Sequence, residues 1–428
     1  MEKSERIYRL VKILYPGIKI KRWILLGTFG VATLSAGLTY LLRRALLATR
    51  SDDQNILPDL LPWHFDGILL LFFGTTLILW SIFGLYQTIS PLLAQNASLE
   101  NIGDILYRRR ALKRGPKIVA IGGGTGLSVL LSGLKNHTDN LTAIIGVTDD
   151  GGSSGRLRRD LGVLPPGDFR NCIVAMSDES SLLQELFQYR FPEGSELKGH
   201  SFGNLFITAM SEISNGFENG ISESSKVLAV RGSIAPATVN LIQLSATLES
   251  GEHIVGESEI RSKASTVSKI YIDPPDAQAY DPVIKSILGA DTIILGPGSL
   301  YTSVLPNLLV HGIAEALCNT NATKIYICNV ATEIGETGGY DLSKHVEALQ
   351  KHTFSEVVDY VIANDNITEI GDRFAGESVK NIPLSDDHIV YVYSDIVDID
   401  NPVRHDSGKL SQVIMELVEK DKRTKSVR

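Results

Sequence analysis

The chain has 428 residues, of which 43% are hydrophobic, so it can bury a substantial core in one large domain or two ordinary ones. Its net charge of −8 argues against a nucleic-acid partner, because binding to a phosphate backbone requires a basic surface. Cys172, Cys318 and Cys328 show no paired spacing, which argues against a disulfide framework or a thiolate zinc site and fits a reducing compartment.

Two apolar segments in residues 1–90 predict a hairpin of two transmembrane helices. Residues 23–42 and 67–89 contain no charged side chain and are long enough to cross a bilayer. A cleaved signal peptide is the alternative for the first segment, but that segment is too long and a second one follows it. Basic residues before the first segment and after the second predict that both ends are cytoplasmic. We therefore expect a cytoplasmic domain anchored to the cytoplasmic membrane.

Residues 91–115 are expected to form an amphipathic linker. Leu99, Ile102 and Leu106 lie near one helical face, and arginines follow them. Such a helix suits a surface of anionic lipid headgroups, and a solvated linker helix is the alternative. Gly115 and Pro116 then mark the start of a domain over residues 116–428.

Short apolar strands alternate with helical patterns from residue 117 onward, which is typical of a Rossmann-like, doubly wound α/β fold with a mostly parallel sheet. The expected strands are residues 118–121, 142–147, 292–295, 324–328 and 357–362. A β-hairpin over residues 241–248 and 253–260 is expected as an addition to this sheet. A polar loop follows each of the five strands, and such loops meet at one edge of a parallel sheet. One large polar crevice is therefore predicted.

The first of these loops, residues 122–126, is glycine-rich and leads directly into a helix. Glycines let the chain turn sharply, so that backbone N–H groups can approach an anion at the helix N-terminus. The dinucleotide fingerprint is incomplete, because Leu127 stands where its third glycine would be. The loop indicates a nucleotide or phosphate site more securely than an NAD site.

The loop after the second strand, residues 149–159, combines carboxylates, hydroxyls and arginines. Backbone N–H groups and a guanidinium suit a diphosphate. Asp149 and Asp150 suit Mg²⁺, which usually takes only one or two protein ligands. A solvated Gly-Ser loop with surface arginines is the alternative.

Two further helix starts carry polar candidates. Asp168 is expected to cap the helix that carries Asn171, and both could also contact a ligand. Residues 199–203 match the G-x-S-x-G pattern of serine hydrolases, with Ser201 as nucleophile. No strand precedes this pattern, so a glycine-hinged loop before the helix from Asn204 is the better interpretation.

A second strand-to-helix turn, residues 296–299, is followed by a helix that we expect to extend to Leu317. Two helix N-termini at one edge of the sheet suit an extended anionic ligand, such as a nucleotide with a second polar group. His345 and His352 lie on one predicted helix without metal-ligand spacing, so we expect them to be ordinary surface or core residues.

The domain resembles the gluconeogenesis factor family, which is related to 2-phospho-L-lactate transferase. The resemblance rests on seven motifs in order: GGGTGLSVLLSGLK, DDGGSSGRLR, LPPGDFRNC, LFQYRF, GHSFGN, LGPGSLYTSVLPNLL and a segment beginning IYICN. It implies a Rossmann-like fold and binding of a nucleotide sugar such as UDP-N-acetylglucosamine. It also implies a role in cell shape and envelope synthesis on gluconeogenic carbon, with partners among envelope-synthesis proteins. Familiar members are soluble and cytoplasmic, so the hairpin is an addition.

The motifs and the resemblance together give one set of expected site residues. The ligand-binding candidates are Gly122, Gly123, Gly124, Thr125, Gly126, Ser153, Ser154, Gly155, Arg156, Asp168, Asn171, Asn204, Gly296, Gly298, Ser299, Asn329 and Arg404. Asp149 and Asp150 are the metal and catalytic candidates if the protein is an enzyme.

The favoured expectation is a nucleotide-sugar-binding regulator without an obligatory cofactor. The alternative is a Mg²⁺-dependent transferase of the 2-phospho-L-lactate transferase type, in which Arg156 and Arg158 would stabilise phosphate charge. An NAD-linked oxidoreductase is a third and weaker reading. The oligomeric state, a homo-oligomer included, stays open.

Overall fold

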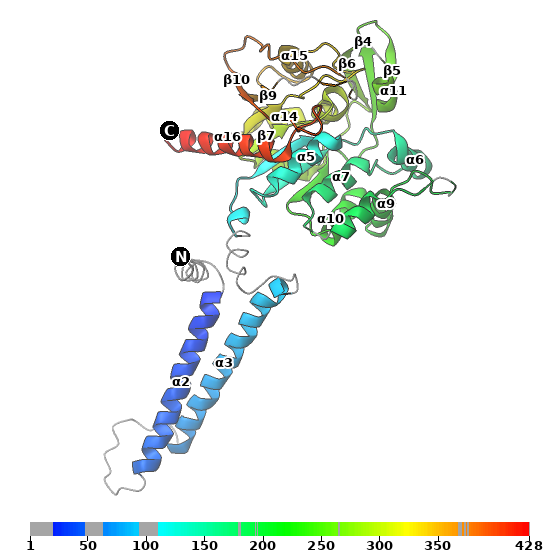
Figure 1. The fold of residues 1–428 in the computed structure, drawn as a ribbon. Helices are drawn as coiled ribbons and strands as arrows, with labels where there is room; N and C mark the ends of the chain where they lie inside the picture. Colours follow the sequence, from blue (N-terminus) through cyan, green and yellow to red (C-terminus); the bar gives the residue numbers. More distant parts are fainter. Residues whose placement is uncertain are drawn as a thin grey trace. The chain divides into compact units, whose positions relative to one another are not determined.

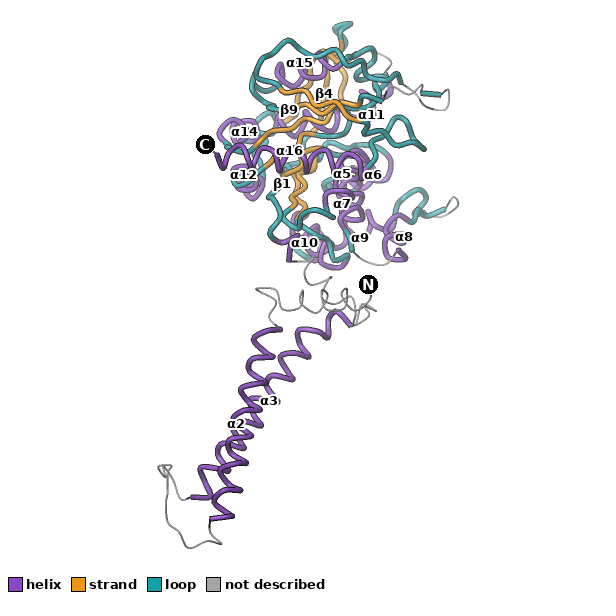
Figure 2. The backbone as a smooth tube through the Cα atoms, turned by 60° about the vertical axis from the view of Figure 1, so that its left-hand side comes forward, coloured by secondary structure: helices purple, strands orange, loops and turns teal. Residues whose placement is uncertain are grey.

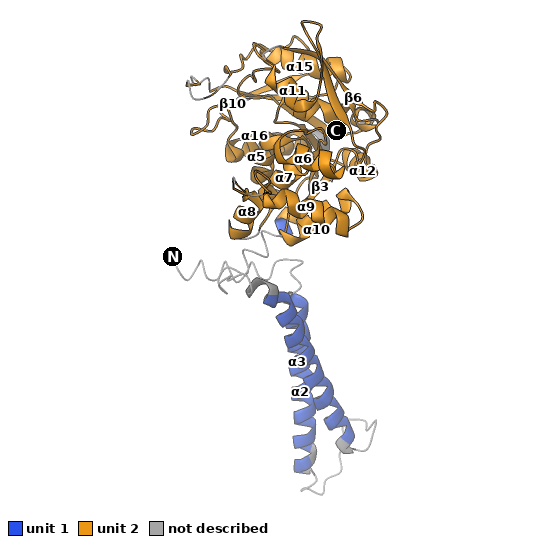
Figure 3. Cartoon of the chain, turned by 90° about the vertical axis from the view of Figure 1, so that its right-hand side faces the viewer, with its two compact units in different colours: residues 1–111 blue, residues 112–428 orange. Residues whose placement is uncertain are grey.

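The computed structural model describes residues 20–47, 63–93 and 110–427, apart from 179–180, 193, 195, 264–265, 367–369, 372–373 and 375 (Figure 1). The chain divides into two compact units, Met1–Ala111 and Leu112–Arg428 (Figure 3). The expected linker, residues 91–115, falls mostly outside the described residues.

The first unit is built from two long helices, α2 (Ile20–Leu47) and α3 (Trp63–Leu93). Each contains a stretch that is long and apolar enough to cross a membrane, Lys21–Arg43 and Phe65–Thr88. Large apolar side chains stay exposed along both helices, for example Phe72, which is 74% exposed. An apolar surface of this extent is typical of a site that contacts a membrane or another protein.

The two helices of the first unit run antiparallel and touch through small residues. A Cβ atom on Gly74 would lie 2.7 Å from the backbone nitrogen of Leu34, and one on Gly84 would lie 2.3 Å from the Trp23 ring. Ser81 also donates a hydrogen bond to the carbonyl oxygen of Trp23 (2.6 Å). Glycine and serine at such a contact let helix backbones approach closely, as in membrane helix pairs.

A seven-stranded parallel sheet forms the centre of the second unit, in the order β10-β9-β8-β7-β1-β2-β3. Its strands are β1 (Ile118–Gly122), β2 (Leu141–Ile145), β3 (Ser233–Pro236), β7 (Thr292–Leu295), β8 (Thr323–Ile327), β9 (Tyr360–Asn364) and β10 (Val390–Ser394). The five expected strands are confirmed as the inner ones. The edge strands β3 and β10 were not expected, because they are only partly buried and lack a continuous apolar pattern.

Helices cover both faces of the sheet (Figure 2). The sheet grows from β1 to β3 in one direction and from β7 to β10 in the other, so right-handed crossovers place the two sets of helices on opposite faces. The first set is α5 (Gly124–Leu134), α6 (Gly152–Leu161), α7 (Gly167–Met176), α8 (Ser181–Gln188), α9 (Phe202–Ile213) and α10 (Phe217–Val227). The second is α13 (Leu305–Leu309), α14 (Ile313–Asn319) and α15 (Leu342–His352), while α12 (Asp281–Leu288) packs on α14.

The C-terminal helix α16 (Ser407–Val427) packs on α5. The contact is tight, because a Cβ atom on Gly133 of α5 would lie 2.2 Å from the carbonyl oxygen of Ser407. The glycine is therefore required for α16 to lie at this distance.

A small antiparallel sheet of order β5-β4-β6 is added to the core, from β4 (Gln243–Leu248), β5 (His253–Val255) and β6 (Val267–Asp273). The expected hairpin is confirmed as β4 and β5, but β5 ends earlier than residue 260. Gly256 adopts a φ of 104°, and the short helix α11 (Glu257–Ser262) follows it. A positive φ is available to glycine at little cost, so the chain leaves the strand there.

The single helix expected from Leu300 to Leu317 is wrong. The segment contains a π-helical turn, η2 (Leu300–Val304), then α13 and α14. Gly312, with a φ of 92°, separates the last two helices. π-helical turns are rare and often occur at functional sites.

Strand β1 is the switch point of the sheet. Both β2 and β7 pair with it, and their connections leave in opposite directions. The loops that follow β1 and β7 therefore face each other at the carboxyl edge, where open α/β sheets bind their ligands.

Candidate functional site

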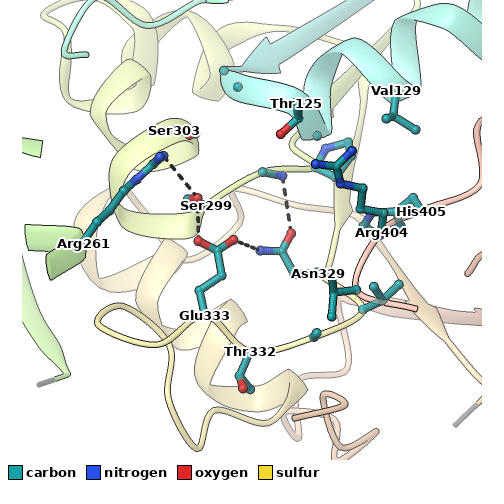
Figure 4. Close-up of a pocket in the computed structure, with 18 of the residues that line it drawn as sticks. Thr125, Val129, Arg261, Ser299, Ser303, Asn329, Thr332, Glu333, Arg404 and His405 are labelled. Atoms are coloured by element: carbon teal, nitrogen blue, oxygen red, sulfur yellow. Dashed lines mark hydrogen bonds between the residues drawn. The ribbon is translucent and has the colours of Figure 1, made fainter. Parts of the chain in front are cut away.

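A cavity of about 400 Å³ lies at this switch point and is lined by the loops after β1, β7 and β8 and by the segment before α16 (Figure 4). We call it the switch-point pocket. Eight of the expected site residues line it: Gly123, Gly124, Thr125, Gly126, Gly298, Ser299, Asn329 and Arg404. The volume falls in the range of small-molecule sites.

The two glycine loops of the pocket touch each other. A Cβ atom on Gly126 would lie 2.7 Å from the carbonyl oxygen of Pro297, and Gly298 adopts a φ of 148°. Gly122 and Gly296 do not line the pocket. They lie behind the loops, where Gly122 accepts a hydrogen bond from Asn307 (3.2 Å) and Gly296 makes a turn with a φ of 82°.

One wall of the pocket is a network centred on Glu333, shown in Figure 4. The hydroxyl of Ser299 donates to Oε2 of Glu333 (2.6 Å), and Nδ2 of Asn329 donates to Oε1 (3.1 Å). The backbone N–H of Gly298 donates to Oδ1 of Asn329 (3.4 Å). An ionised carboxylate has about four acceptor positions, so Glu333 can still accept hydrogen bonds from ligand hydroxyls.

Two arginines reach the pocket, and only one of them lies within ion-pair distance of described acids. Arg261 of α11 pairs with Glu257 (3.2 Å) and donates to the hydroxyl of Thr302 (3.1 Å). Arg404 is exposed and forms no ion pair within the described part of the chain. A free guanidinium beside two glycine loops suits phosphate oxygens.

His405, next to Arg404, is a neutral wall residue. Its Nε2–H donates to the carbonyl oxygen of Cys328 (3.1 Å), and burial lowers the pKa of the imidazole to about 4. This histidine adds no positive charge to the pocket near neutral pH.

Asp168 links the pocket to a neighbouring acidic region. The expectation that it caps its own helix is wrong, because α7 begins at Gly167 without a side-chain cap. Its Oδ2 instead accepts a hydrogen bond from the backbone N–H of Gly124 (2.6 Å) and so holds the first glycine loop. Burial, and then the charge of Asp149, raises the pKa of the Asp168 carboxyl to about 6.

Asp150 holds the start of α11. Its Oδ1 accepts hydrogen bonds from the backbone N–H of Ser258 (2.9 Å) and from the hydroxyl of the same residue (2.6 Å). Asp149 accepts the N–H of Gly151 through Oδ1 (3.0 Å), and no hydrogen bond to its Oδ2 comes from a described residue. Each of the two acids therefore keeps its Oδ2 without a hydrogen bond from a described residue.

Asp149 and Asp150 fit a Mg²⁺ site only of the kind in which one or two protein oxygens and several waters coordinate the ion. Among the described residues, no three His, Cys, Asp or Glu side chains are grouped as a metal site. The charge of Asp149 nevertheless raises the pKa of both Asp168 and Glu257, after burial, so the region carries negative charge that a cation would offset. The metal role of Asp149 and Asp150 stays a prediction.

Glu257 is a buried acid that the sequence did not indicate. The hydroxyl of Thr148 donates to its Oε2 (2.8 Å), and Arg261 pairs with its Oε1. Burial raises the pKa of Glu257 to about 8. Both Glu257 and Arg261 come from α11, which follows the added hairpin rather than a strand of the main sheet. The expectation that site residues follow the strands of the parallel sheet therefore did not predict them.

The remaining expected residues lie in a separate polar region around the start of α6. Ser153 lies 3.0 Å from Nδ1 of His200, and its hydroxyl oxygen also accepts from Nδ2 of Asn204 (3.1 Å). Ser154 accepts the N–H of Gly167 (3.1 Å). The other members are Gly155, Arg156 and Asn171, whose Oδ1 accepts from Arg170 (2.9 Å). Whether they bind a ligand stays a prediction.

Two earlier hypotheses are affected by the arrangement of this region. Ser201 is buried and caps α9, because its hydroxyl accepts the N–H of Asn204 (3.2 Å). It also accepts a hydrogen bond from Arg170 (2.5 Å), and neither of these two described partners is a base that could activate it as a nucleophile. Arg158 is held by the backbone carbonyl oxygens of Val147 (3.2 Å) and Ile242, and its role in stabilising phosphate charge stays a prediction.

The chain is similar to several known proteins. Residues 118–421 match the family of 2-phospho-L-lactate transferase CofD. The gluconeogenesis factor of Bacillus subtilis is 42% identical over 311 residues, which are 71% of this chain and 98% of that protein. A Clostridium acetobutylicum protein with gluconeogenesis factor in its name is 41% identical over 420 residues, 94% of this chain and 90% of its own length. A crystal structure of a UPF0052 family member from Bacillus halodurans, 42% identical, has a TM-score of 0.65 and covers 70% of this chain and 99% of its own.

Proposed function

Since the chain belongs to the gluconeogenesis factor family, with a domain of the 2-phospho-L-lactate transferase CofD type, we propose that it binds a nucleotide diphosphate sugar in the switch-point pocket. UDP-N-acetylglucosamine is the ligand of this class that we favour. In this proposal the protein is a regulator of cell shape and envelope synthesis during gluconeogenic growth, and it acts through binding rather than turnover.

The observation that supports this function best is the pairing of two glycine loops with a free arginine. The glycine loops after β1 and β7 line the pocket with backbone that a phosphate can approach closely, and the guanidinium of Arg404 has no ion pair among the described residues. A diphosphate carries enough charge and acceptors to use all three. The Glu333 carboxylate on the facing wall suits ribose or hexose hydroxyls.

The first unit supports a location at the cytoplasmic membrane. Its two helices are long and apolar enough to span a bilayer and expose apolar side chains along their length. A domain anchored in this way would be held at the surface where envelope precursors are handled. Its partners would then be other proteins of envelope synthesis.

The test of the ligand proposal is calorimetric binding of UDP-N-acetylglucosamine to the full chain in detergent. Arg404→Gln is expected to weaken binding by about 10- to 100-fold, because it removes charge-assisted hydrogen bonds worth about 1.5–3 kcal/mol. Lys226→Gln removes an exposed positive charge that pairs with Glu223 (2.6 Å) on α10, and it should leave the affinity unchanged. Absence of binding to the unaltered chain would refute the proposal.

A Mg²⁺-dependent transferase is the second candidate, and the acidic region beside the pocket favours it. Asp149 would hold the ion, which when bound would offset the charge of the transferring phosphoryl group. Asp168, with a pKa raised to about 6, is suited to accept the proton of an attacking alcohol, and it is already positioned against the glycine loop.

Product formation from nucleotide-activated phospholactyl donors and an alcohol acceptor tests this second candidate. We expect Asp149→Asn to lower the rate by at least about 100-fold, since general acid–base catalysis and electrostatic stabilisation each typically contribute that much. Glu259→Gln, an exposed acid on α11, is the matched control and should keep the rate. If the unaltered chain forms no product with Mg²⁺ present, the transferase interpretation fails.

A further inference from the structure

Three arginines surround the loop of residues 199–203 (GHSFG), which is not part of the lining of the switch-point pocket. Nη1 of Arg170 donates to the hydroxyl of Ser201 (2.5 Å), and Nη1 of Arg190 donates to the carbonyl oxygen of Gly199 (3.3 Å). Nη2 of Arg156 lies 3.2 Å from the position that a Cβ atom of Gly199 would occupy. We call Arg156, Arg170 and Arg190 the arginine cluster.

No member of the arginine cluster forms an ion pair with a described residue, although the charges of Asp168 and Asp149 act on Arg170 from a greater distance. Arg170 is only 5% exposed, and its Nε has no hydrogen-bond acceptor. Nε of Arg156 is likewise buried without a partner. Burial, and then the charge of Arg190, lowers the pKa of Arg170 to about 10. Buried guanidinium groups are normally paired, so this arrangement calls for an anion.

The start of α6 adds further anion-binding groups to the same loop. Helix α6 has 10 residues, and Ser153 in its first turn lies 3.0 Å from Nδ1 of His200. Nδ2 of Asn204 also donates to the Ser153 oxygen (3.1 Å). The free backbone N–H groups of a helix N-terminus favour an anion.

We propose that the arginine cluster, the loop of residues 199–203 and the N-terminus of α6 bind the phosphoryl group of a second ligand. Three guanidinium groups without an ion pair among the described residues match a phosphoryl dianion better than a carboxylate, which carries one charge and two oxygens. This site goes beyond the proposed function, which needs only the switch-point pocket. The two sites share the first turn of α7, where Asp168 holds the glycine loop and Arg170 enters the arginine cluster.

The test is a titration of the full chain in detergent with inorganic phosphate, phenyl phosphate and acetate, each at constant ionic strength, followed by calorimetry and thermal unfolding. Saturable binding of the two phosphates with little binding of acetate is expected. Tighter binding of phenyl phosphate than of inorganic phosphate would identify a phosphate monoester as the natural ligand, and the reverse order would identify free phosphate.

The variants separate this site from the switch-point pocket. Arg156→Gln should weaken phosphate binding by at least about tenfold, whereas Arg404→Gln, in the lining of the switch-point pocket, should leave phosphate binding unchanged. Arg159→Gln is the control, since this exposed residue lies on the same helix and donates only to the carbonyl oxygen of Asp150 (3.4 Å). Arg170→Met removes the buried charge and should fold, but lose the stabilisation by phosphate.

Two results would overturn the proposal. One is phosphate binding that survives Arg156→Gln but is lost in Arg404→Gln, which would place the phosphate in the switch-point pocket. The other is the absence of saturable phosphate binding. A chain that binds phosphate through Arg156 but no nucleotide sugar would leave this inference standing and refute the proposed function instead.

Discussion

Gly155→Ala is expected to destabilise the second unit by at least about 3 kcal/mol, at the upper end of what overpacking usually costs. A Cβ atom at this position would lie 1.8 Å from the carbonyl oxygen of Asp150, and backbone cannot move aside as a flexible side chain can. Relief would require α6 to shift away from the end of β2, and the loop with Asp149 and Asp150 would move with it.

The measurement for this variant is the midpoint of thermal or urea unfolding of the full chain in detergent. A loss of about 3 kcal/mol corresponds to a fall in Tm of roughly 4–5 °C for a domain of this size. Gly338→Ala is the matched control, because no atom lies within 4 Å of its added Cβ and its φ is not in the left-handed region. Equal stability of the two variants would show that the α6 loop yields more easily than this geometry indicates.

Glu257→Gln is expected to stabilise the ligand-free chain at alkaline pH. Burial raises the pKa of Glu257 from 4.5 to about 8, so the folded protein holds a proton that the unfolded chain releases between these values. The stability from this group is therefore fully present below pH 4.5 and is lost as pH rises through 8. The variant avoids this loss, so at pH 8 its free energy of unfolding should exceed that of the unaltered chain by on the order of 2–4 kcal/mol.

Urea unfolding from pH 5 to 8.5 checks this expectation. The unaltered chain should lose stability with rising pH, whereas Glu257→Gln should show a flatter profile and approach the unaltered chain near pH 5. Glu259→Gln, exposed on the same helix, should follow the unaltered chain throughout. Parallel profiles for the unaltered chain and Glu257→Gln would mean that Arg261 keeps the carboxylate ionised at neutral pH.

The inner strands and the two glycine loops could be predicted because their signals are local. A run of buried residues such as β1 is followed at once by glycine, and the parallel sheet brings the ends of such runs together. Asn329 and Arg404 were predicted as site residues from the family resemblance, and they line the same pocket.

The contacts that could not be predicted join residues far apart in the sequence. Asp168 has the local pattern of a helix cap, but a hydrogen bond to Gly124 decides its position. Glu257 and Arg261 enter the site because Asp150 holds the start of α11 through Ser258. Such hydrogen bonds depend on the assembled fold, so they cannot be predicted from the propensities of the residues or from their spacing in the sequence.

The switch-point pocket has its first wall at Gly123 and Gly124 and its last at Arg404 and His405, near opposite ends of the second unit in the sequence. During synthesis the glycine loops leave the ribosome long before the arginine does. A nascent or truncated chain therefore lacks Arg404 and His405, which precede α16, the helix that packs on α5. The pocket of such a chain is incomplete, so the ligand cannot stabilise its fold. Ligand binding would then distinguish complete domains from incomplete ones, because only a fully synthesised and folded domain can bind the ligand.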